Sequence, residues 1–272
     1  MFSPFYARAV GRGPADPGVY CAFNVGLYGP RSRHSWVFSE YRPADVTRAA
    51  TEFRLGANRL HWDGQRLTID IDDRGAPLQQ RIVGSITATP LATTSAPIAF
   101  GSAGAHRWWP VAPAVDLSVD IDSPSLAWQG RGYTDMNDGA EPLHEGFDEW
   151  HWCRWHDRDI SRVQYRALHA DGETTTLDLS ITADGGVQRQ TLPNPQRLRR
   201  SGWGIEREWY GKTTPSAIAT IDDTPFYARS LLLRGDAPPV MHESLSLARF
   251  RRPWVRRLLP FRMRFPVQRL FV

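Results

Sequence analysis

The chain has 272 residues, of which 41% are apolar and 11% aromatic, and its mean hydropathy is −0.43. This composition is typical of a globular protein with enough material for one large or two smaller domains, and no run approaches the ~20 apolar residues of a membrane-spanning helix. Two cysteines, Cys21 and Cys153, are too few for a disulfide framework or a four-thiolate metal site, so we expect two buried thiols rather than a disulfide. The first residues, 1–13, lack a signal-type apolar run, which predicts a cytoplasmic protein.

Most of the chain is predicted to form strands. One short helix is expected at Pro43–Thr51, because Pro43 suits a first helical turn. Further along, apolar and polar residues alternate strictly in three segments: Leu67–Asp72, Val115–Asp122 and Leu177–Thr182. Such alternation indicates antiparallel strands with one buried face and one wet face.

Turn signals separate these strands and suggest how they connect. Examples are Asp63-Gly64 and Ala170-Asp171-Gly172, and the second joins residues 163–169 to 174–182 in a predicted hairpin. Many short antiparallel strands favour closed or nearly closed barrels of about 130 residues each. We therefore predict an all-β fold of two barrels in tandem, with domains at 1–138 and 139–272, because Asp, Gly and Pro cluster at Asp138–Leu143.

The middle of the chain is unusually rich in tryptophan. Six of the eleven tryptophans lie between Trp108 and Trp155, and two dense segments stand out: His106-Arg107-Trp108-Trp109-Pro110 and Trp128 through Gly139. A packed core rarely needs so much indole in so short a span, whereas a cavity for a long apolar ligand or a cationic intermediate does. Asp135 lies in the second segment, where desolvation would raise its pKa and make it a candidate acid.

Residue spacing groups these candidates. His106 and Trp108 are two apart, as are Tyr133 and Asp135, so each pair shares one face of a strand. Trp108 and Trp109 point to opposite faces, and only one of them lines a given cavity. The alternatives are structural: Asp135 is a turn residue in Thr-Asp-Met-Asn-Asp-Gly, and His106 is an ordinary residue at the start of a strand.

The C-terminal segment, residues 248–272, carries the basic charge. It contains eight arginines and no acidic residue, although the whole chain has a formal net charge of only +4. Aromatic residues and pairs such as Leu258-Leu259 interleave with the arginines, a pattern that suits an anionic membrane surface. A nucleic-acid tail would not need this apolar content, and the remaining alternative is a solvated or strand-paired C-terminus.

An ordered set of motifs covers at least the first 155 residues and consists of Phe2–Tyr6, Arg12–Pro17, Phe23–Gly29, His61–Gly64, His106–Pro110, Trp128–Gly139 and Phe147–Arg154. In this order the motifs resemble one known family, the bacterial carotenoid 1,2-hydratases (hydroxyneurosporene synthases). The resemblance implies a tandem lipocalin-like fold. It also implies hydration of an acyclic carotenoid of the neurosporene or lycopene type, without a cofactor or a metal.

The family's functional His-x-Trp and Tyr-x-Asp pairs correspond to His106 with Trp108 and Tyr133 with Asp135. In this interpretation Asp135 protonates the terminal double bond, water adds to the resulting tertiary cation, and Trp108 and Tyr133 face that cation. His106 polarises or reprotonates the acid, or holds the water. The tryptophans Trp109, Trp128, Trp150 and Trp152 are the candidate substrate-binding residues. His144, His151 and His156 have spacings that do not fit a metal site.

The expected partners are the carotenoid, water, an anionic membrane surface contacted through residues 248–272, and other enzymes of carotenoid synthesis, but not nucleic acid. The expected location is the cytoplasmic side of the inner, photosynthetic membrane. Two other functions remain open. A lipocalin-like carrier of an isoprenoid would need the aromatic pocket but not Asp135. A terpenoid cyclase or isomerase would need the acid but would exclude water.

Overall fold

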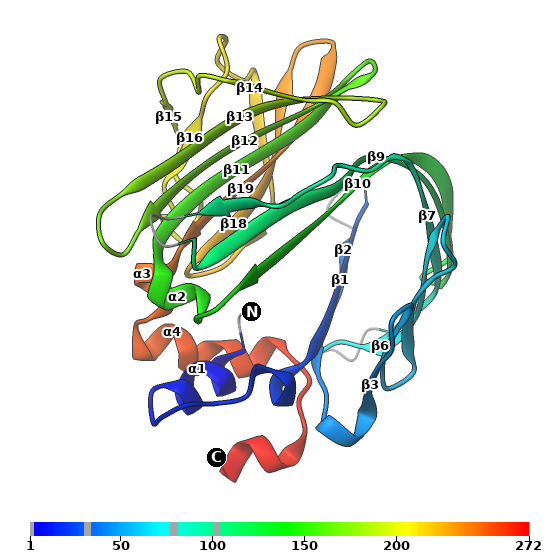
Figure 1. Ribbon diagram of the computed structural model, residues 1–272. Coiled ribbons are helices and arrows are strands. Elements are labelled where there is room, and N and C mark those ends of the chain that lie inside the picture. Colours follow the sequence, from blue (N-terminus) through cyan, green and yellow to red (C-terminus); the bar gives the residue numbers. More distant parts are fainter. Residues whose placement is uncertain (1–2, 30–33, 77–80, 101–103, 272) are drawn as a thin grey trace. The chain divides into compact units, whose positions relative to one another are not determined.

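The computed structural model of the chain describes residues 3–29, 34–76, 81–100 and 104–271 (Figure 1). Phe2 and Val272, which belong to two of the sequence motifs, lie outside the described residues. The contacts divide the chain into two compact units. Unit 1 comprises residues 1–90, 115–132 and 256–272, and unit 2 comprises residues 91–114 and 133–255. The single boundary between residues 138 and 139 stays a prediction.

The first half of the chain forms a small hairpin and one large antiparallel sheet. The hairpin pairs β1 (Ala22–Tyr28) with β2 (His34–Glu40). The sheet has the order β10-β9-β7-β6-β5-β4-β3, and β8 pairs with β9. Its strands are β3 (Val46–Arg48), β4 (Glu52–Leu55), β5 (Asn58–Trp62), β6 (Leu67–Arg74), β7 (Arg81–Ala92), β8 (Ile98–Phe100), β9 (His106–Ser123) and β10 (Leu126–Gly139).

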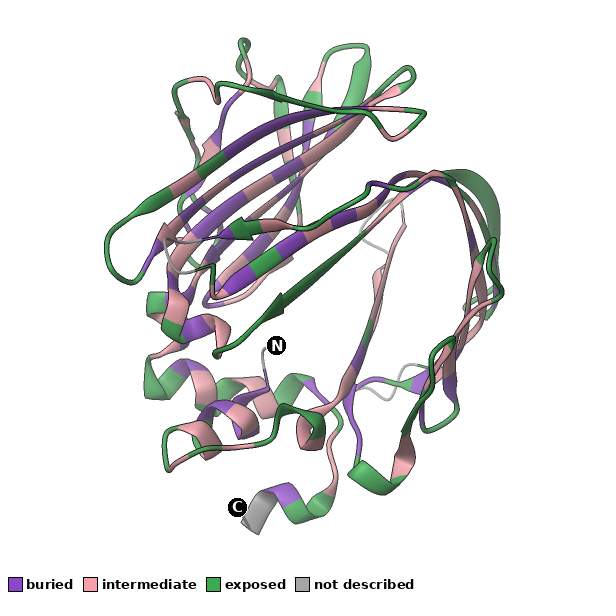
Figure 2. Cartoon of the chain, viewed as in Figure 1, coloured by how far each residue is buried: buried purple, intermediate pink, exposed green. Residues whose placement is uncertain are grey.

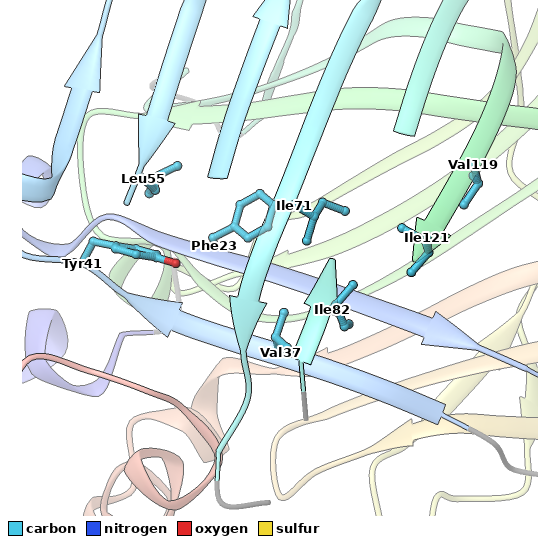
Figure 3. Close-up of a cluster of buried hydrophobic side chains, with 8 residues drawn as sticks. All are labelled: Phe23, Val37, Tyr41, Leu55, Ile71, Ile82, Val119 and Ile121. Atoms are coloured by element: carbon cyan, nitrogen blue, oxygen red, sulfur yellow. The ribbon is translucent and has the colours of Figure 1, made fainter. Parts of the chain in front are cut away.

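The core of unit 1 is a cluster of buried side chains that the hairpin and the sheet share. Figure 3 shows its members: Phe23, Val37, Tyr41, Leu55, Ile71, Ile82, Val119 and Ile121. Gly64 occupies the turn between β5 and β6 with a φ of 98°, a conformation that residues with a Cβ rarely adopt.

The core of unit 2 is a seven-stranded sheet. Its order is β14-β13-β12-β11-β19-β18-β17, and β15 pairs separately with β16. The strands are β11 (Phe147–Asp157), β12 (Ile160–His169), β13 (Thr174–Thr182), β14 (Val187–Gln190), β15 (Gln196–Leu198), β16 (Arg207–Trp209), β17 (Ala217–Asp223), β18 (Tyr227–Arg234) and β19 (Ala237–Ser246). Buried and partly exposed residues alternate along most of β12 and β18, whereas β13 has five consecutive buried residues and β14 is exposed (Figure 2).

The helices are short and lie mainly near the two ends of the sequence. The α-helices are α1 (Pro4–Val10), α2 (Leu143–Gly146), α3 (Leu247–Phe250) and α4 (Pro253–Leu258). The 3-10 helices are η1 (Pro17–Tyr20), η3 (Pro43–Asp45), η4 (Leu259–Arg262) and η5 (Val267–Phe271). Ser3 begins α1 as its N-cap, where its hydroxyl accepts a hydrogen bond from the Tyr6 N–H. None of the helices among the described residues is long and apolar enough to cross a membrane.

The strand predictions are confirmed, and one helix prediction is wrong. Leu67–Asp72, Val115–Asp122 and Leu177–Thr182 lie within β6, β9 and β13, and β12 pairs with β13 as the predicted hairpin. The helix expected at Pro43–Thr51 is limited to the 3-10 turn η3. The β-branched Val46 and Thr47 that follow it pair with β4 instead, because strand pairing satisfies their backbone and suits their side chains.

The all-β class is confirmed, but two closed barrels are not. Among the described residues no sheet is closed: β3 and β10 end one sheet, and β14 and β17 end the other. Closure depends on the tilt and stagger with which the end strands meet, and the alternation of apolar residues along a strand does not encode either.

Candidate active site

The start of β9 places two of the candidate residues on one face of a strand in unit 2. His106 and Trp108 are buried and Arg107 between them is exposed, so the predicted sharing of a face is confirmed. The short strand β8 pairs with this segment, Phe100 opposite His106. Trp109 points the other way, and its indole N–H donates to the Thr94 hydroxyl at 2.9 Å.

Asp135 is the centre of a hydrogen-bonded cluster. Its Oδ2 accepts a hydrogen bond from the Trp108 indole N–H at 2.8 Å and another from the Tyr133 hydroxyl at 3.2 Å. Asp135 lies within β10, so the alternative that it is a turn residue is wrong. Near the same end of the two strands, Arg107 forms a two-bond ion pair with Asp138, at 2.7 and 2.9 Å.

His106 does not join this cluster. Its Nε2 lies 3.1 Å from Oε1 of Glu141, and its ring centroid is 4.7 Å from that of Phe147. Two glycines leave room for the imidazole. A Cβ at Gly139 would lie 2.4 Å from its Nδ1, and one at Gly146 would lie 2.3 Å from its Nε2. Three of the four predicted catalytic residues are therefore hydrogen-bonded together, and the fourth is held beside Glu141.

The surroundings of Asp135 raise the pKa of its carboxyl group. Burial raises the pKa of its carboxyl group, and the negative charge of Glu243 raises it further, while the two hydrogen bonds and the Arg154 charge lower it. Asp135 still has exposed surface, so a small molecule can reach a carboxyl group that the surrounding protein desolvates. Burial likewise raises the pKa of the Tyr133 hydroxyl well above its ordinary value, so that group stays a hydrogen-bond donor.

Aromatic rings from β9, β11 and β12 surround the cluster. Tyr165 lies opposite Trp152 in the β11–β12 register, and its ring centroid is 5.7 Å from that of Trp108 and 6.1 Å from that of Trp150. The Trp152 and Tyr133 rings are 5.8 Å apart. The Trp152 indole N–H is buried and has no hydrogen-bond acceptor among the described residues.

A small pocket adjoins this aromatic group. Its volume is about 20 Å³, roughly the space that one water molecule needs. The side chains that line it include Phe100, His106, Trp108, Phe147, Trp150 and Tyr165. Trp108 therefore contacts Asp135 through its indole N–H and the pocket through its ring.

Of the predicted substrate-binding residues, Trp109, Trp150 and Trp152 belong to unit 2, whereas Trp128 belongs to unit 1. Trp150 is buried, Trp109 and Trp152 are partly exposed, and the Trp128 side chain is 44% exposed.

Sequence reasoning did not single out three residues that act on Asp135 or its neighbours: Arg154, Tyr165 and Glu243. The guanidinium carbon of Arg154 lies 5.1 Å from the centroid of the Tyr133 ring. The alternation Trp150, Trp152, Arg154 along one strand was a usable signal for Arg154. No such signal existed for Glu243, because only the pairing of β11 with β19 places it opposite Trp152.

The described residues contain no group of three or more His, Cys, Asp or Glu side chains arranged to hold a metal ion. His151 contacts the Ser244 hydroxyl at 2.9 Å, and His156 contacts Arg154. The His144 ring packs on Phe250, with the ring centroids 5.4 Å apart. Cys21 and Cys153 are free.

Comparison with known proteins gives a consistent result. The family model described as Carotenoid hydratase CrtC matches residues 1–270. The acyclic carotenoid 1,2-hydratases of Thiocapsa roseopersicina and Rubrivivax gelatinosus are 38% and 35% identical over 97% of this chain. These alignments cover 66% of each relative, so the chain spans about two thirds of their length.

The acyclic carotenoid 1,2-hydratase of Rhodobacter capsulatus is 30% identical over 97% of this chain and 94% of the relative. Among solved structures, an AttH-type protein of Nitrosomonas europaea matches with a TM-score of 0.57 and 14% identity, over 83% of this chain and 80% of that one. At that identity the likeness supports the fold alone.

Proposed function

Because the chain belongs to the carotenoid hydratase CrtC family, we propose that it is an acyclic carotenoid 1,2-hydratase, a hydro-lyase that adds water across the terminal C1–C2 double bond of its substrate. The observation that carries this proposal is the accessible Asp135 carboxyl group, whose pKa burial raises and which Trp108 and Tyr133 orient. Neurosporene and lycopene are the substrates of the type expected.

Asp135 is the acid in this reaction. Its O–H bond breaks, the proton forms a C–H bond at C2, and the alkene electrons leave a tertiary cation at C1. A water molecule then adds to C1, and the proton that this water loses returns to the Asp135 carboxylate. Each cycle consumes one water and leaves the protein unchanged, so the step needs no oxidant or reductant.

The aromatic rings stabilise the cation. Trp108, Tyr133, Trp152 and Tyr165 present π faces or edges near the carboxyl group, and a desolvated ring face contributes roughly 0.5–2 kcal/mol of attraction to a cation. Trp109, Trp150 and Trp152 of unit 2 remain the proposed contacts to the polyene, and Trp128 of unit 1 stays an untested prediction. His106, fixed beside Glu141 and lining the water-sized pocket, is proposed to hold the attacking water.

The test is product formation. Cells that make lycopene or neurosporene, and that express this chain, should accumulate carotenoids heavier by one water per hydrated end, whereas cells expressing Asp135→Asn should not. If the wild-type chain binds the polyene but yields no hydrated product, a carrier is favoured. A cyclised or isomerised product of unchanged mass would instead favour a cyclase or isomerase.

An apolar substrate also requires a route from the bilayer, and residues 248–272 are the proposed contact. At least five arginines of this segment have contacts within the chain: Arg249 with the Trp203 carbonyl, Arg251 with the His144 carbonyl, Arg264 with Asp73, Arg269 with Glu40 and Arg262 over the Trp36 ring. These arginines serve the fold, so the membrane role falls to exposed residues elsewhere in the segment.

The remaining surface has both charge and apolar area. Trp254, Leu258 and Phe261 are 42%, 41% and 70% exposed, and Arg252 and Arg257 are exposed beside them. Each arginine near an anionic surface contributes about 1 kcal/mol, and salt screens that attraction. This composition supports reversible binding at the cytoplasmic face of the inner membrane.

Vesicle co-sedimentation tests this surface. Leu258→Ser with Phe261→Ser should weaken binding to anionic vesicles, and high salt should weaken binding of the wild type. Val187→Ser, which removes a similarly exposed apolar side chain from β14, is the matched control. Unchanged binding by the double variant would contradict the membrane role and favour delivery of the substrate by a neighbouring enzyme.

A further inference from the structure

Arg154 lies in the interior of the unit 2 sheet and faces the proton donor. It pairs with Val163 of β12 on one side and with Met241 of β19 on the other. Its guanidinium carbon stands 5.1 Å from the centroid of the Tyr133 ring, whose hydroxyl donates to Asp135. Arg154 and Trp152, two residues apart on β11, therefore both contact the same tyrosine ring.

A relay of hydrogen bonds fixes this guanidinium. Arg154 Nη1 donates to Nε2 of His156 at 2.8 Å, so that nitrogen carries no proton. Nδ1 of His156 lies 2.9 Å from the Ser161 hydroxyl, which gives its own hydrogen to the Pro113 carbonyl at 2.6 Å and hence accepts from Nδ1–H. The relay selects the neutral Nδ1–H tautomer of His156, the one that leaves Nε2 free to accept from Arg154.

Within the described part of the chain, the positive charge of Arg154 has no carboxylate in direct contact. None of the salt bridges among the described residues includes it, and burial lowers the pKa of its guanidinium, which nevertheless remains charged. A desolvated cation without a paired carboxylate is unfavourable for stability unless another group uses the charge. The carboxylates that act on this region are Asp135 itself and Glu243 of β19.

We propose that Arg154 is a positioning residue for the proton donor: it holds the Tyr133 ring toward Asp135 and stabilises the carboxylate that Asp135 becomes when its proton passes to the substrate. The inference rests on the proposed function, in which Asp135 is the acid. Proton transfer to an alkene becomes easier as the conjugate base becomes more stable. Arg154 thereby offsets Glu243, whose negative charge opposes ionisation of Asp135.

The charged and titratable groups that face Asp135 come from four strands. They are Tyr133 on β10, Arg154 on β11, Tyr165 on β12 and Glu243 on β19, and Glu243 is itself bonded to Arg229 of β18 at 2.9 Å. Arg154 is the cation of this set that contacts the Tyr133–Asp135 pair. Removing its charge should therefore raise the pKa of Asp135, which weakens the acid and keeps it protonated to higher pH.

The test is the pH profile of kcat/KM for hydration. Because activity needs protonated Asp135, the rate falls as pH rises through the pKa of that group. In Arg154→Met this decline should move up by about one pH unit, and the low-pH plateau should fall by about 3–10-fold. Arg154→Lys, which keeps the charge, should leave the decline near its wild-type pH. Arg162→Met, on the opposite face of the same sheet and bonded to Gln190, should change neither quantity.

A second measurement covers variants too weak to assay. Carbon-detected NMR titration of the Asp135 carboxyl, assigned by its loss in Asp135→Asn, should give a higher pKa in Arg154→Met or Arg154→Gln than in the wild type. The inference would be overturned if the pKa of Asp135 did not change. It would also be overturned if kcat/KM at low pH fell while its decline with pH stayed in place, and Arg154 would then have a packing role. Full turnover by Asp135→Asn would instead reject the acid itself, so the two failures are distinguishable.

Discussion

Two aspartates, one in each unit, have similar polar neighbours but different roles: Asp73 is structural, and Asp135 is the proposed acid. Asp73 in unit 1 is buried and accepts from the Ser39 hydroxyl, the Tyr41 hydroxyl and the Arg264 guanidinium, at 2.8, 2.8 and 2.7 Å. Asp135 in unit 2 also has a tyrosine donor, but its second donor is an uncharged indole, and no cation bonds to it directly. Asp73 is satisfied as a carboxylate, whereas Asp135 keeps accessible surface and a raised pKa.

The comparison separates structural carboxylates from reactive ones. The three donors to Asp73, one of them an arginine, tie separate segments of unit 1 together, so this side chain stabilises the fold. Asp135 instead has two uncharged donors and a nearby negative charge, so its pKa is raised, and it keeps exposed surface from which it can meet a substrate. The difference lies in the cation and the exposed surface, not in the residue type.

Asp135→Asn should have the largest effect on catalysis. Asparagine keeps an acceptor for the Trp108 indole N–H but cannot protonate an alkene, so kcat/KM should fall by at least about 100-fold. The melting temperature should change little. Asp116→Asn, on β9 in an exposed ion pair with Arg131, is the control and should remain active. Near-normal turnover by Asp135→Asn would remove the contrast between the two aspartates.

Asp73→Asn should lower stability and leave activity intact, the reverse of Asp135→Asn. The substitution leaves Arg264 without its carboxylate, so the free energy of unfolding should fall by about 2–4 kcal/mol. The loss stays moderate because half of the Arg264 side chain is exposed and water can solvate the unpaired charge. Activity per folded molecule should be retained. Urea unfolding, paired with turnover measured at low urea, checks both statements. A stable but inactive Asp73→Asn variant would show that unit 1 contributes chemistry as well.

Stability should also depend on pH through Asp135. Its pKa is raised in the folded state, so the folded chain binds the proton more tightly than the unfolded chain does. The stability from this group is complete below the ordinary aspartate pKa and is lost as pH rises through the raised value. Urea unfolding should therefore be measured at several pH values from acid to neutral. As the pH rises, the free energy of unfolding of the wild type should fall relative to that of Asp135→Asn. A difference that is constant with pH would contradict the raised pKa.

Much of the site was predictable because a strand has a simple period. Alternation alone placed His106 with Trp108 and Tyr133 with Asp135, and the hydrogen bonds from Trp108 and Tyr133 to Asp135 then connect the two pairs. The same period located β6, β9 and β13. Sequence could not place His106 beside Glu141, because that contact depends on the turn after β10 and on two glycines that leave space for the ring.

Long-range pairing accounts for most of what sequence reasoning missed. Glu243 acts on Asp135 only because β19 lies beside β11, more than a hundred residues after Asp135 in the chain. The arginines of the tail looked uniform, yet Arg264 and Arg269 each find a buried carboxylate while Arg252 and Arg257 stay exposed. Barrel closure, which was not confirmed, also depends on long-range pairing, because the two strands that end a sheet would have to pair with each other.

Tyr133→Phe should have the smallest effect on catalysis, and it tests most directly how Asp135 differs from Asp73. The variant loses one hydrogen bond to Asp135 but keeps the ring between Trp152 and Arg154, so cation stabilisation by the ring should survive. Because that bond lowers the pKa of Asp135, its loss should move the decline of activity to higher pH while kcat falls by about 10-fold or less. Tyr41→Phe, which removes the corresponding bond to Asp73, is the matched control and should lower stability without moving the pH profile. A loss of activity by Tyr133→Phe as complete as that of Asp135→Asn would instead assign the hydroxyl a direct part in proton transfer.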